Sequence, residues 1–266
     1  SDLLFSIIII NYKTTELTAQ CIRSLFNLPN PENREIIVID NNSNDDSIVK
    51  LQAEFKDKIK ILANRKNLGF AGANNQGATL AQGKFLLFLN SDTIVKEDIF
   101  SSALKIFNEN TKLGVLSPRL LQENNEPQKM AYNYFPTFWR LITRKSKQEI
   151  KIPTNTKILE VDWVSGCALM IKRDLFNQLG GWDDNFFLYF EDVDLCKRVK
   201  QAGYQVMVDL NTNIIHLGGK SLEKNSERKK YYYEGQDYYF GKNNKKMERI
   251  LIKIFKLPIK ALKTIK

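Results

Sequence analysis

Residues 7–10 are four consecutive isoleucines, and this run constrains the fold more than any other feature of the chain. A strand with one face in water alternates apolar and polar residues, whereas an unbroken apolar run is typical of a strand buried on both faces. Strands of that kind occur in parallel sheets that helices cover on both sides. The run therefore predicts an α/β fold.

The first hundred residues continue this pattern, because short β-rich runs alternate with segments of helical spacing. Strands are expected at residues 5–10, 35–40, 59–63 and 84–90, with helices at 14–27, 45–55 and 71–81 between them. Such alternation is typical of a mostly parallel central sheet flanked by helices. We predict that residues 1–95 form a Rossmann-like, nucleotide-binding half.

The middle of the chain is expected to complete the same domain, which we place at residues 1–221. Helices are expected at 97–108, 173–178 and 191–202, and strands at 113–117, 168–171, 205–208 and 213–216. Between them, residues 122–153 lose periodicity and become polar, aromatic and proline-bearing. We expect that stretch to be a loop or lid over the site.

The net charge of +10 is concentrated at the end of the chain. Residues 220–266 hold 14 lysines and arginines against five acidic residues, which leaves about +1 for residues 1–219. A nearly neutral body argues against a nucleic-acid-binding protein and predicts no nucleic-acid partner. That class stays an alternative because of the pI near 9.3 and the tyrosines at 231–233.

The basic stretch has an amphipathic pattern from Met247 onward, with lysines on one face and Ile, Leu and Met on the other. A basic amphipathic helix is typical of segments that lie on anionic membranes, although Pro258 predicts a kink. The alternative is an ordinary helix docked on the core with its lysines outward. We expect residues 222–266 to be a helical tail that contacts a membrane surface.

The cysteines and the N-terminal sequence bear on the compartment. Cys21, Cys167 and Cys196 form no CxxC pair, which favours a reducing compartment over a disulfide framework or a zinc site. The chain starts without the basic region and cleavage site of a signal peptide, and no apolar run reaches the ~18 residues of a membrane span. We expect a cytoplasmic protein on the inner face of the cytoplasmic membrane.

Polar residues follow three of the expected strands, at the sheet edge where open α/β folds bind ligands. Asp40 could accept the N3–H of uracil or thymine, or merely cap the next helix. Tyr12 could lie against the same base, or only pack. The small residues of 67–75 could bring backbone N–H groups to a diphosphate, or simply start a helix. Asp92 could bind a divalent cation, or be a turn carboxylate that caps the helix from Lys96.

Residues 182–198 hold the densest group of acidic side chains in the sequence. Glu191, Asp192 and Asp194 stand at an expected helix start, where the helix dipole favours negative charge. Three carboxylates in four residues exceed that need. Glu191 and Asp194 share one face, so Asp192 could act alone as a general base, while Asp194 and Arg198 would form an i, i+4 ion pair.

Two further segments are candidates for the site. Trp163, Ser165 and Gly166 could form an acceptor wall, although core packing is the alternative for Trp163. His216, the only histidine, precedes a pair of glycines and could bind a metal or a phosphate, or be structural.

In this order the motifs resemble glycosyltransferase family 2, in particular its rhamnosyltransferase-like branch. The resemblance covers about residues 5–221 and rests on residues 6–12, 39–43, 67–75, 89–93 and 190–195. It implies a GT-A fold, a nucleoside-diphosphate sugar donor, Mg²⁺ or Mn²⁺, and inversion at the anomeric carbon. It also implies that residues 96–221 form the acceptor and catalytic half. One departure is Asn90, which stands where the DXD-type metal motif has its first carboxylate.

The resemblance assigns roles to individual residues. Asp192 is the base that deprotonates the acceptor, with Glu191 beside it, and Asp92 and His216 are the metal ligands. The donor contacts are Asn11, Tyr12, Asp40, Asn42, Asn67, Gly69, Asn74 and Ser91, and the acceptor contacts are Trp163, Ser165, Gly166 and Trp182.

The expected partners follow from the same resemblance. They are a nucleotide sugar, with dTDP-L-rhamnose first and UDP sugars next, and a glycan or lipid-linked acceptor of bacterial surface polysaccharide synthesis. A sugar-nucleotide pyrophosphorylase is a further alternative with the same sheet architecture. The stretch after the first strand, residues 11–15, lacks the glycine-rich, lysine-bearing loop of that class.

Overall fold

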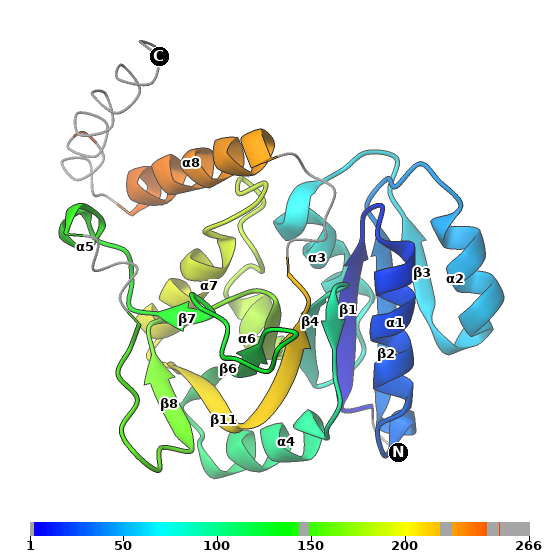
Figure 1. Cartoon of the computed structure of the whole chain (residues 1–266), viewed down its shortest axis with the longest axis horizontal. Helices are drawn as coiled ribbons and strands as arrows, with labels where there is room; N and C mark the ends of the chain where they lie inside the picture. Colours follow the sequence, from blue (N-terminus) through cyan, green and yellow to red (C-terminus); the bar gives the residue numbers. More distant parts are fainter. Residues whose placement is uncertain (1–2, 144–148, 219–224, 244–249, 251–266) are drawn as a thin grey trace.

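The computed structural model describes residues 3–143, 149–218, 225–243 and Ile250 (Figure 1). The first half forms β1 (Phe5–Asn11), α1 (Thr15–Phe26), β2 (Arg34–Asp40), α2 (Ser47–Phe55), β3 (Lys60–Ala63), α3 (Gly69–Leu80) and β4 (Phe85–Asn90). Two 3-10 turns, η1 (Pro31–Asn33) and η2 (Lys56–Lys58), precede β2 and β3. Every strand and helix expected in this half is confirmed, with its ends shifted by at most two residues.

The second half contains more short elements than the sequence pattern predicts. It forms β5 (Thr93–Ile94), α4 (Ile99–Glu109), β6 (Leu113–Leu121), β7 (Tyr132–Asn133), α5 (Phe138–Ile142), β8 (Ile158–Val161), β9 (Trp163–Val164), β10 (Ala168–Lys172), α6 (Arg173–Gln178), α7 (Glu191–Gln201), β11 (Gln205–His216) and α8 (Asn225–Lys242). The two strands expected at 205–208 and 213–216 are one strand, β11, whose pairing with β6 shifts register between Asp209 and Asn213.

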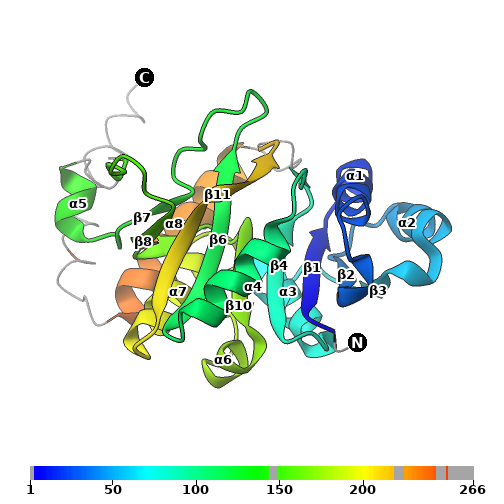
Figure 2. The same ribbon diagram turned by 90° about the horizontal axis from the view of Figure 1, so that it is seen from below.

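The main sheet has the strand order β3-β2-β1-β4-β10-β6-β11-β5, and β8 pairs with another part of β11, residues 206–209 (Figure 2). Strands β3, β2, β1 and β4 are parallel, as the helical connections between them require. β10 runs antiparallel to β4 and β6, and β11 is parallel to β6. The prediction of a mostly parallel, helix-flanked central sheet is confirmed.

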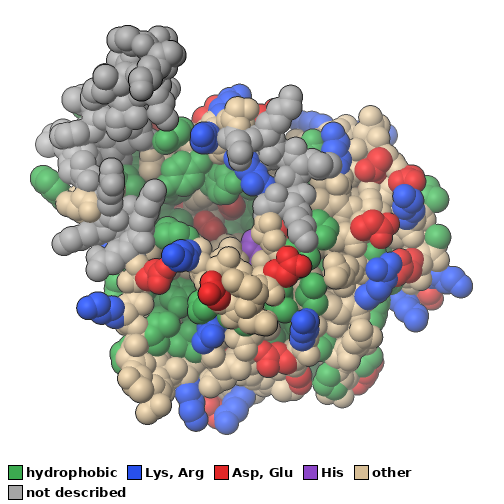
Figure 3. Space-filling model, in the orientation of Figure 1, with side chains coloured by type: hydrophobic (Ala, Val, Ile, Leu, Met, Phe, Trp, Pro, Cys, Tyr) green, Lys and Arg blue, Asp and Glu red, His purple; other side chains and the backbone are tan. Residues whose placement is uncertain are grey.

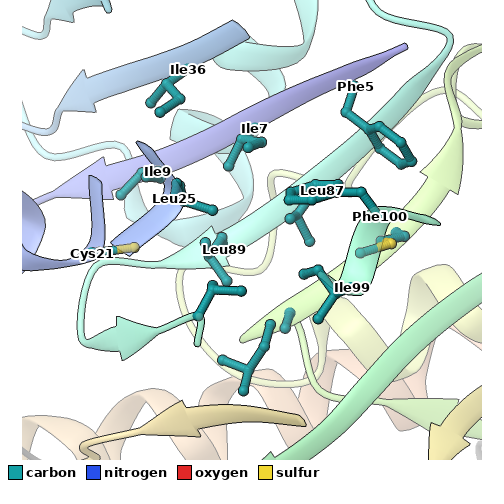
Figure 4. Packing of buried hydrophobic residues seen from close by; sticks show 14 of the residues in the cluster. Phe5, Ile7, Ile9, Cys21, Leu25, Ile36, Leu87, Leu89, Ile99 and Phe100 are labelled. Carbon is teal, nitrogen blue, oxygen red and sulfur yellow. The ribbon is translucent and has the colours of Figure 1, made fainter. Parts of the chain in front are cut away.

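The isoleucine run is buried on both faces of the sheet, as predicted. Ile7 and Ile9 pack on the side of α1 and α4, whereas Ile8 packs on the side of α3, α6 and α7. Neighbouring side chains of a strand point to opposite faces, so one run supplies two hydrophobic layers. Figure 4 shows the first of these layers, in which Phe5 and Phe100 are among the packed side chains.

In the segment expected as a loop or lid, residues 122–153, the described part (122–143 and 149–153) carries only β7 and α5 as regular structure. β7 pairs with β9 in a small second sheet beside the main one. Among the described residues, no helix is both long and apolar enough to cross a membrane. The amphipathic stretch expected from residue 247 lies outside the described residues, apart from Ile250.

α8 lies across the molecule near α7 and α3 (Figure 1). Its residues Tyr239 and Phe240 are fully buried in the hydrophobic layer that also contains α7. The boundary between residues 1–221 and a tail from 222 stays a prediction, but by its packing α8 belongs with the body of the fold.

Candidate functional site

A pocket opens at the carboxyl ends of β1, β2 and β4, the sheet edge where the sequence places its polar motifs. Figure 3 shows a hollow on this face, with acidic side chains and the histidine of the chain inside it. The sheet contributes Ile10, Tyr12, Thr14, Asn41, Asn90, Ser91 and Asp92, the start of α3 contributes Asn67, Gly69 and Phe70, and a turn before α7 contributes Phe187 and Leu188. Of the eight expected donor contacts, Tyr12, Asn67, Gly69 and Ser91 line this pocket.

Asn41 connects the end of β2 to the start of α3. Its amide nitrogen donates to Asn67 Oδ1 at 2.8 Å and to the Gly69 carbonyl at 3.1 Å, and its Oδ1 accepts from Leu68 N at 3.0 Å. A side-chain amide that bonds to two neighbouring backbone groups holds a loop in one shape. Sequence reasoning selected Asn42, whose backbone instead adopts a left-handed φ of 66° in the turn.

Gly69 is required by the close approach of two segments. Its φ is +72°, and a Cβ at this position would lie 2.3 Å from the carbonyl oxygen of Phe187. That oxygen accepts a hydrogen bond from Phe70 N at 2.8 Å, so the first turn of α3 lies directly against the turn before α7. Only glycine permits both the backbone angle and the contact.

Asp40 lies behind the pocket wall and is 4% exposed. Its carboxylate accepts hydrogen bonds from Asn11 Nδ2 at 2.7 Å and from Ser43 N at 3.1 Å. Asn11 is fully buried beside it, and Asn74 is buried in α3. In this structure these expected donor contacts shape the pocket from behind, and the base-binding role of Asp40 stays a prediction.

The ends of β4 and β11 bring Asp92 and His216 together, although 124 positions separate them. Asp92 Oδ1 lies 3.1 Å from His216 Nε2, and both side chains are 13% exposed. His216 Nδ1 lies 2.8 Å from Gln128 Oε1, so this amide holds the orientation of the imidazole ring. The other ring nitrogen, Nε2, faces Asp92, which lines the pocket.

These two side chains fit a divalent cation. Two ligands that are each about 2.1 Å from one ion, at a right angle, lie about 3.0 Å apart. Carboxylate oxygen with imidazole nitrogen suits Mn²⁺, and a bound diphosphate can supply further oxygens. Within the described ranges no group of three or more His, Cys, Asp or Glu side chains could hold a metal. Asp92 and His216 are the two side chains that would hold a cation at this place.

Glu191 and Asp192 begin α7, beside the pocket. Asp192 Oδ2 accepts from Gly166 N at 3.1 Å and Oδ1 accepts from Val193 N at 2.8 Å. Gly166 also packs against the ring of Phe70, which lines the pocket; a Cβ here would lie 2.9 Å from that ring. The Ser165-Gly166 turn therefore joins Asp192 to the pocket wall.

The two carboxyl groups differ in their surroundings. Burial raises the pKa of Glu191 well above its ordinary value, and the charge on Asp192 raises it further. Burial also raises the pKa of Asp192, but the two backbone N–H groups oppose that change. Glu191 Oε2 is buried without a hydrogen-bond partner, whereas both oxygens of Asp192 accept a backbone hydrogen bond, so the surroundings favour the ionised form of Asp192 over that of Glu191.

Trp163 and Trp182 are core residues in this structure. Trp182 is 2% exposed and packs edge-on against Phe70 and Phe88, with centroids 5.6 and 4.9 Å apart. The Trp163 indole is buried, and its Nε1 donates to the Tyr134 carbonyl at 3.0 Å. Neither ring is open to an acceptor, so core packing, the alternative named for Trp163, describes both.

Sequence reasoning missed two parts of the pocket. Asn41 could have been identified from the sequence, because it lies inside the 39–43 motif of the family resemblance. Phe187 and Leu188 could not, since an apolar pair of residues in a turn looks like any core segment. The predicted ion pair between Asp194 and Arg198 is confirmed, at 2.8 Å.

Comparisons with known proteins agree with this geometry. The family model described as glycosyl transferase family 2 matches residues 6–180. A low-salt glycan biosynthesis hexosyltransferase, Agl10 of Haloferax volcanii, is 29% identical over 207 residues, covering 76% of this chain and 63% of that protein. The rhamnosyltransferase WbbL of Escherichia coli is 27% identical over 153 residues, covering 52% and 56%.

A solved structure shows the same fold. It is a crystal structure of GalNAc-T7 with UDP, GalNAc and Mn²⁺, with a TM-score of 0.64 at 16% identity over 80% of this chain and 44% of that one. The chain spans less than two thirds of the length of each of these three relatives.

Proposed function

The chain belongs to glycosyl transferase family 2, and from this premise we propose that it transfers a sugar from a nucleoside-diphosphate sugar to a hydroxyl of a glycan or lipid-linked acceptor. The fold is that of a GT-A glycosyltransferase, and relatives act in glycan biosynthesis. Because the chain belongs to this family, we set aside the two alternative functions, a nucleic-acid-binding protein and a sugar-nucleotide pyrophosphorylase.

The observation that carries the proposal is the meeting of three groups at one sheet edge. The pocket of β1, β2 and α3 can hold a nucleotide, and Asp92 of its lining contacts His216. Asp192 is connected to the pocket wall by its hydrogen bond from Gly166, which packs on Phe70. A donor site, a place for a diphosphate and a base are the parts that glycosyl transfer needs.

Each group has a role in this proposal. Tyr12 and Asn41 face the nucleoside, and the first turn of α3 faces the diphosphate, where helix N–H groups favour anions. Asp92 and His216 are the residues that would hold Mg²⁺ or Mn²⁺, whose chemistry when bound is to neutralise negative charge on the diphosphate.

Asp192 is the proposed base. The acceptor oxygen forms a bond to the anomeric carbon on one face, and the bond to the diphosphate breaks on the other, with its electron pair leaving on the diphosphate. The hydroxyl proton passes to Asp192, which the N–H groups of Gly166 and Val193 hold in place. Attack opposite the leaving group inverts the anomeric configuration.

The donor sugar is a separate proposal, with dTDP-L-rhamnose first and UDP sugars next. It is supported by the similarity to the rhamnosyltransferase WbbL. Thermal-shift screening of nucleotide sugars with and without Mn²⁺ tests it, because a ligand that binds only the folded chain raises its unfolding temperature. A shift with UDP sugars but none with dTDP-L-rhamnose would reject the first choice.

The test of the reaction is the Asp192→Asn variant. Because asparagine cannot accept the proton, we expect transfer to fall by ~10²-fold or more while the donor still binds. Asp184→Asn, an exposed acid of the same segment, is the control and keeps its activity. Undiminished transfer in Asp192→Asn would remove this residue from the role of base.

A further inference from the structure

The turn that leads into α7 holds an unfavourable backbone shape. Tyr189 and Phe190 have φ angles of 72° and 73°, in the left-handed region that bulky residues rarely occupy. Phe190 is also the N-cap of α7 and provides no side-chain hydrogen bond to the helix start. Two such residues in succession persist only where neighbouring groups hold them in place.

One side of this turn faces the pocket. Phe187 and Leu188 line the pocket, and the Phe187 carbonyl accepts a hydrogen bond from Phe70 N at 2.8 Å. Glu191 and Asp192 follow directly at the start of α7. The shape of the turn therefore decides where Asp192 lies relative to the donor.

The other side of the turn is covered by α8. Its tyrosine rings pack on the aromatic rings of the turn in five pairs, with centroid distances of 4.6 Å for Tyr231 on Phe187, 5.3 Å for Tyr232 on Phe190, 6.0 Å for Tyr232 on Tyr189, 4.7 Å for Tyr238 on Phe186 and 5.7 Å for Tyr239 on Phe190. Each such aromatic pair stabilises the contact between α8 and the turn by more than the burial of its apolar area alone.

Gly235 lets α8 approach the backbone of the turn closely at Tyr189, one of the two residues with a positive φ. It is buried, and a Cβ here would lie 2.4 Å from the Tyr189 carbonyl oxygen and 3.4 Å from that of Leu188. Backbone therefore packs on backbone at this point of α8. Even one methyl group would force the helix and the turn apart.

Lys242, the last residue of α8, binds acidic side chains on both sides of the 186–190 turn. Its Nζ lies 2.6 Å from Asp183 Oδ2, before the turn, and 2.8 Å from Asp194 Oδ1, after it. Tyr238 adds a hydrogen bond to Asp183 at 3.1 Å. The Asp194 side chain is only 2% exposed and forms ion pairs with both Lys242 and Arg198.

We propose that α8 is a positioning element of the active site, which holds the 186–190 turn in its left-handed shape and thereby fixes Asp192 against the donor pocket. This inference rests on the proposed function, and it goes beyond it by making part of the basic C-terminal region necessary for catalysis. Gly235 and Lys242 are its positioning residues.

The test compares Gly235→Ala with Glu234→Ala, which adds an alanine at the neighbouring exposed position of the same helix. Alanine favours helix over either residue, so a weaker helix cannot explain a loss. We expect Gly235→Ala to lower kcat by about 10- to 100-fold, with a far smaller change in the dissociation constant of the nucleoside diphosphate. Glu234→Ala retains the wild-type kcat.

Hydrogen exchange gives a readout that needs no activity. In Gly235→Ala the amides of residues 186–196 should exchange faster, while those of β1, β2 and β4 keep their protection. Lys242→Met should show the same local effect, with Lys230→Met, from an exposed ion pair, as its control. Unchanged exchange at 186–196 in both variants would overturn the inference, and so would faster exchange through the whole sheet, which signals general destabilisation.

The outcomes also separate this inference from the proposed function. If the wild-type chain transfers no sugar, the proposed function fails, and faster exchange at 186–196 still shows that α8 holds the turn. If transfer is present and Gly235→Ala retains the wild-type kcat, only the positioning role of α8 fails.

Discussion

Glu191 and Asp192 are neighbours in sequence, yet their surroundings give the two carboxyl groups different chemistry. Asp192 accepts hydrogen bonds from two backbone N–H groups, whereas Oε2 of Glu191 is buried without a hydrogen-bond partner. Two adjacent carboxyl groups do not both ionise easily in a buried site. The arrangement therefore favours a single charge on the pair, with the ionised form of Asp192 the better stabilised of the two.

This assignment predicts different effects of two isosteric changes. Glutamine mimics a protonated glutamate, so Glu191→Gln should retain far more transfer than Asp192→Asn. Because burial raises the pKa of Asp192 and the base must be deprotonated, wild-type transfer should decline as the pH falls through a value above that of an ordinary aspartate. A pH profile of kcat/KM measures this, and equal losses in the two variants would contradict the assignment.

The pair of Asp92 and His216 predicts how metal dependence responds to mutation. Removal of divalent cations with a chelator should abolish transfer, and Mn²⁺ should restore it. His216→Ala should raise the Mn²⁺ concentration needed for half-maximal transfer by at least about tenfold, because one of two protein ligands is lost. Direct Mn²⁺ titration, followed by electron paramagnetic resonance, checks binding apart from activity. Unaltered Mn²⁺ binding in His216→Ala would exclude this residue as a ligand.

At the scale of elements, α7 and α8 are joined by one cluster of charges. Asp183, Asp194, Arg198 and Lys242 lie within hydrogen-bond distance of one another in a chain. Burial opposes ionisation of Asp183, but hydrogen bonds from Lys242 and Asn185 outweigh it and lower the pKa of this carboxyl to about 2. The part of the cluster that Asp183 forms therefore contributes stability only while Asp183 is ionised.

This shift predicts how acid affects the attachment of α8. An aspartate whose folded pKa lies below its unfolded pKa stabilises the fold above the unfolded value, and this stability is lost as the pH falls through the folded value. From pH 5 to pH 2 the wild-type chain should lose about 1 kcal/mol through Asp183, after allowance for solvent screening. Chemical unfolding at each pH measures the loss.

The Lys242→Met variant is the matched comparison, because it removes the hydrogen bond that lowers the pKa of Asp183. The difference in free energy of unfolding between wild type and Lys242→Met should shrink between pH 5 and pH 2. For Lys230→Met, which lies on the exposed side of α8, the difference should stay constant. A constant difference for Lys242→Met as well would show that the cluster does not stabilise the fold.

At the scale of the whole molecule, the chain combines a nearly neutral body with a basic end. α8 is part of the body, since Tyr239 and Phe240 are buried in the core, whereas the amphipathic pattern begins at Met247. We propose that residues 244–266 bind the inner face of the cytoplasmic membrane, where lipid-linked acceptors would be found. The support for this proposal is the sequence pattern alone.

Truncation after Asn243 tests the proposal without removing α8. The full chain should sediment with vesicles that contain anionic lipid, and less so at high salt, because the attraction is partly electrostatic. The truncated chain should remain in the supernatant, yet transfer sugar to a water-soluble acceptor at the wild-type rate. Equal sedimentation of the two chains would remove the tail from membrane binding.

The sequence by itself determined the architecture of the first half of the chain. The unbroken run at residues 7–10 required a strand buried on both faces, and the alternation of strands with helices required a parallel sheet. From these two points the common sheet edge follows, and with it the meeting of residues 12, 67 and 92 at one pocket. Local periodicity reports such features because each depends on one segment at a time.

Only the tertiary structure decided which side chain of a motif reaches the pocket and which supports it from behind. Asn41 lies on the wall and Asp40 behind it, the Trp182 ring is closed in the core, and α8 packs on the turn before α7. These outcomes depend on contacts between segments far apart in the chain. Their free energy comes from shape and burial after the elements pack, and no local pattern encodes it.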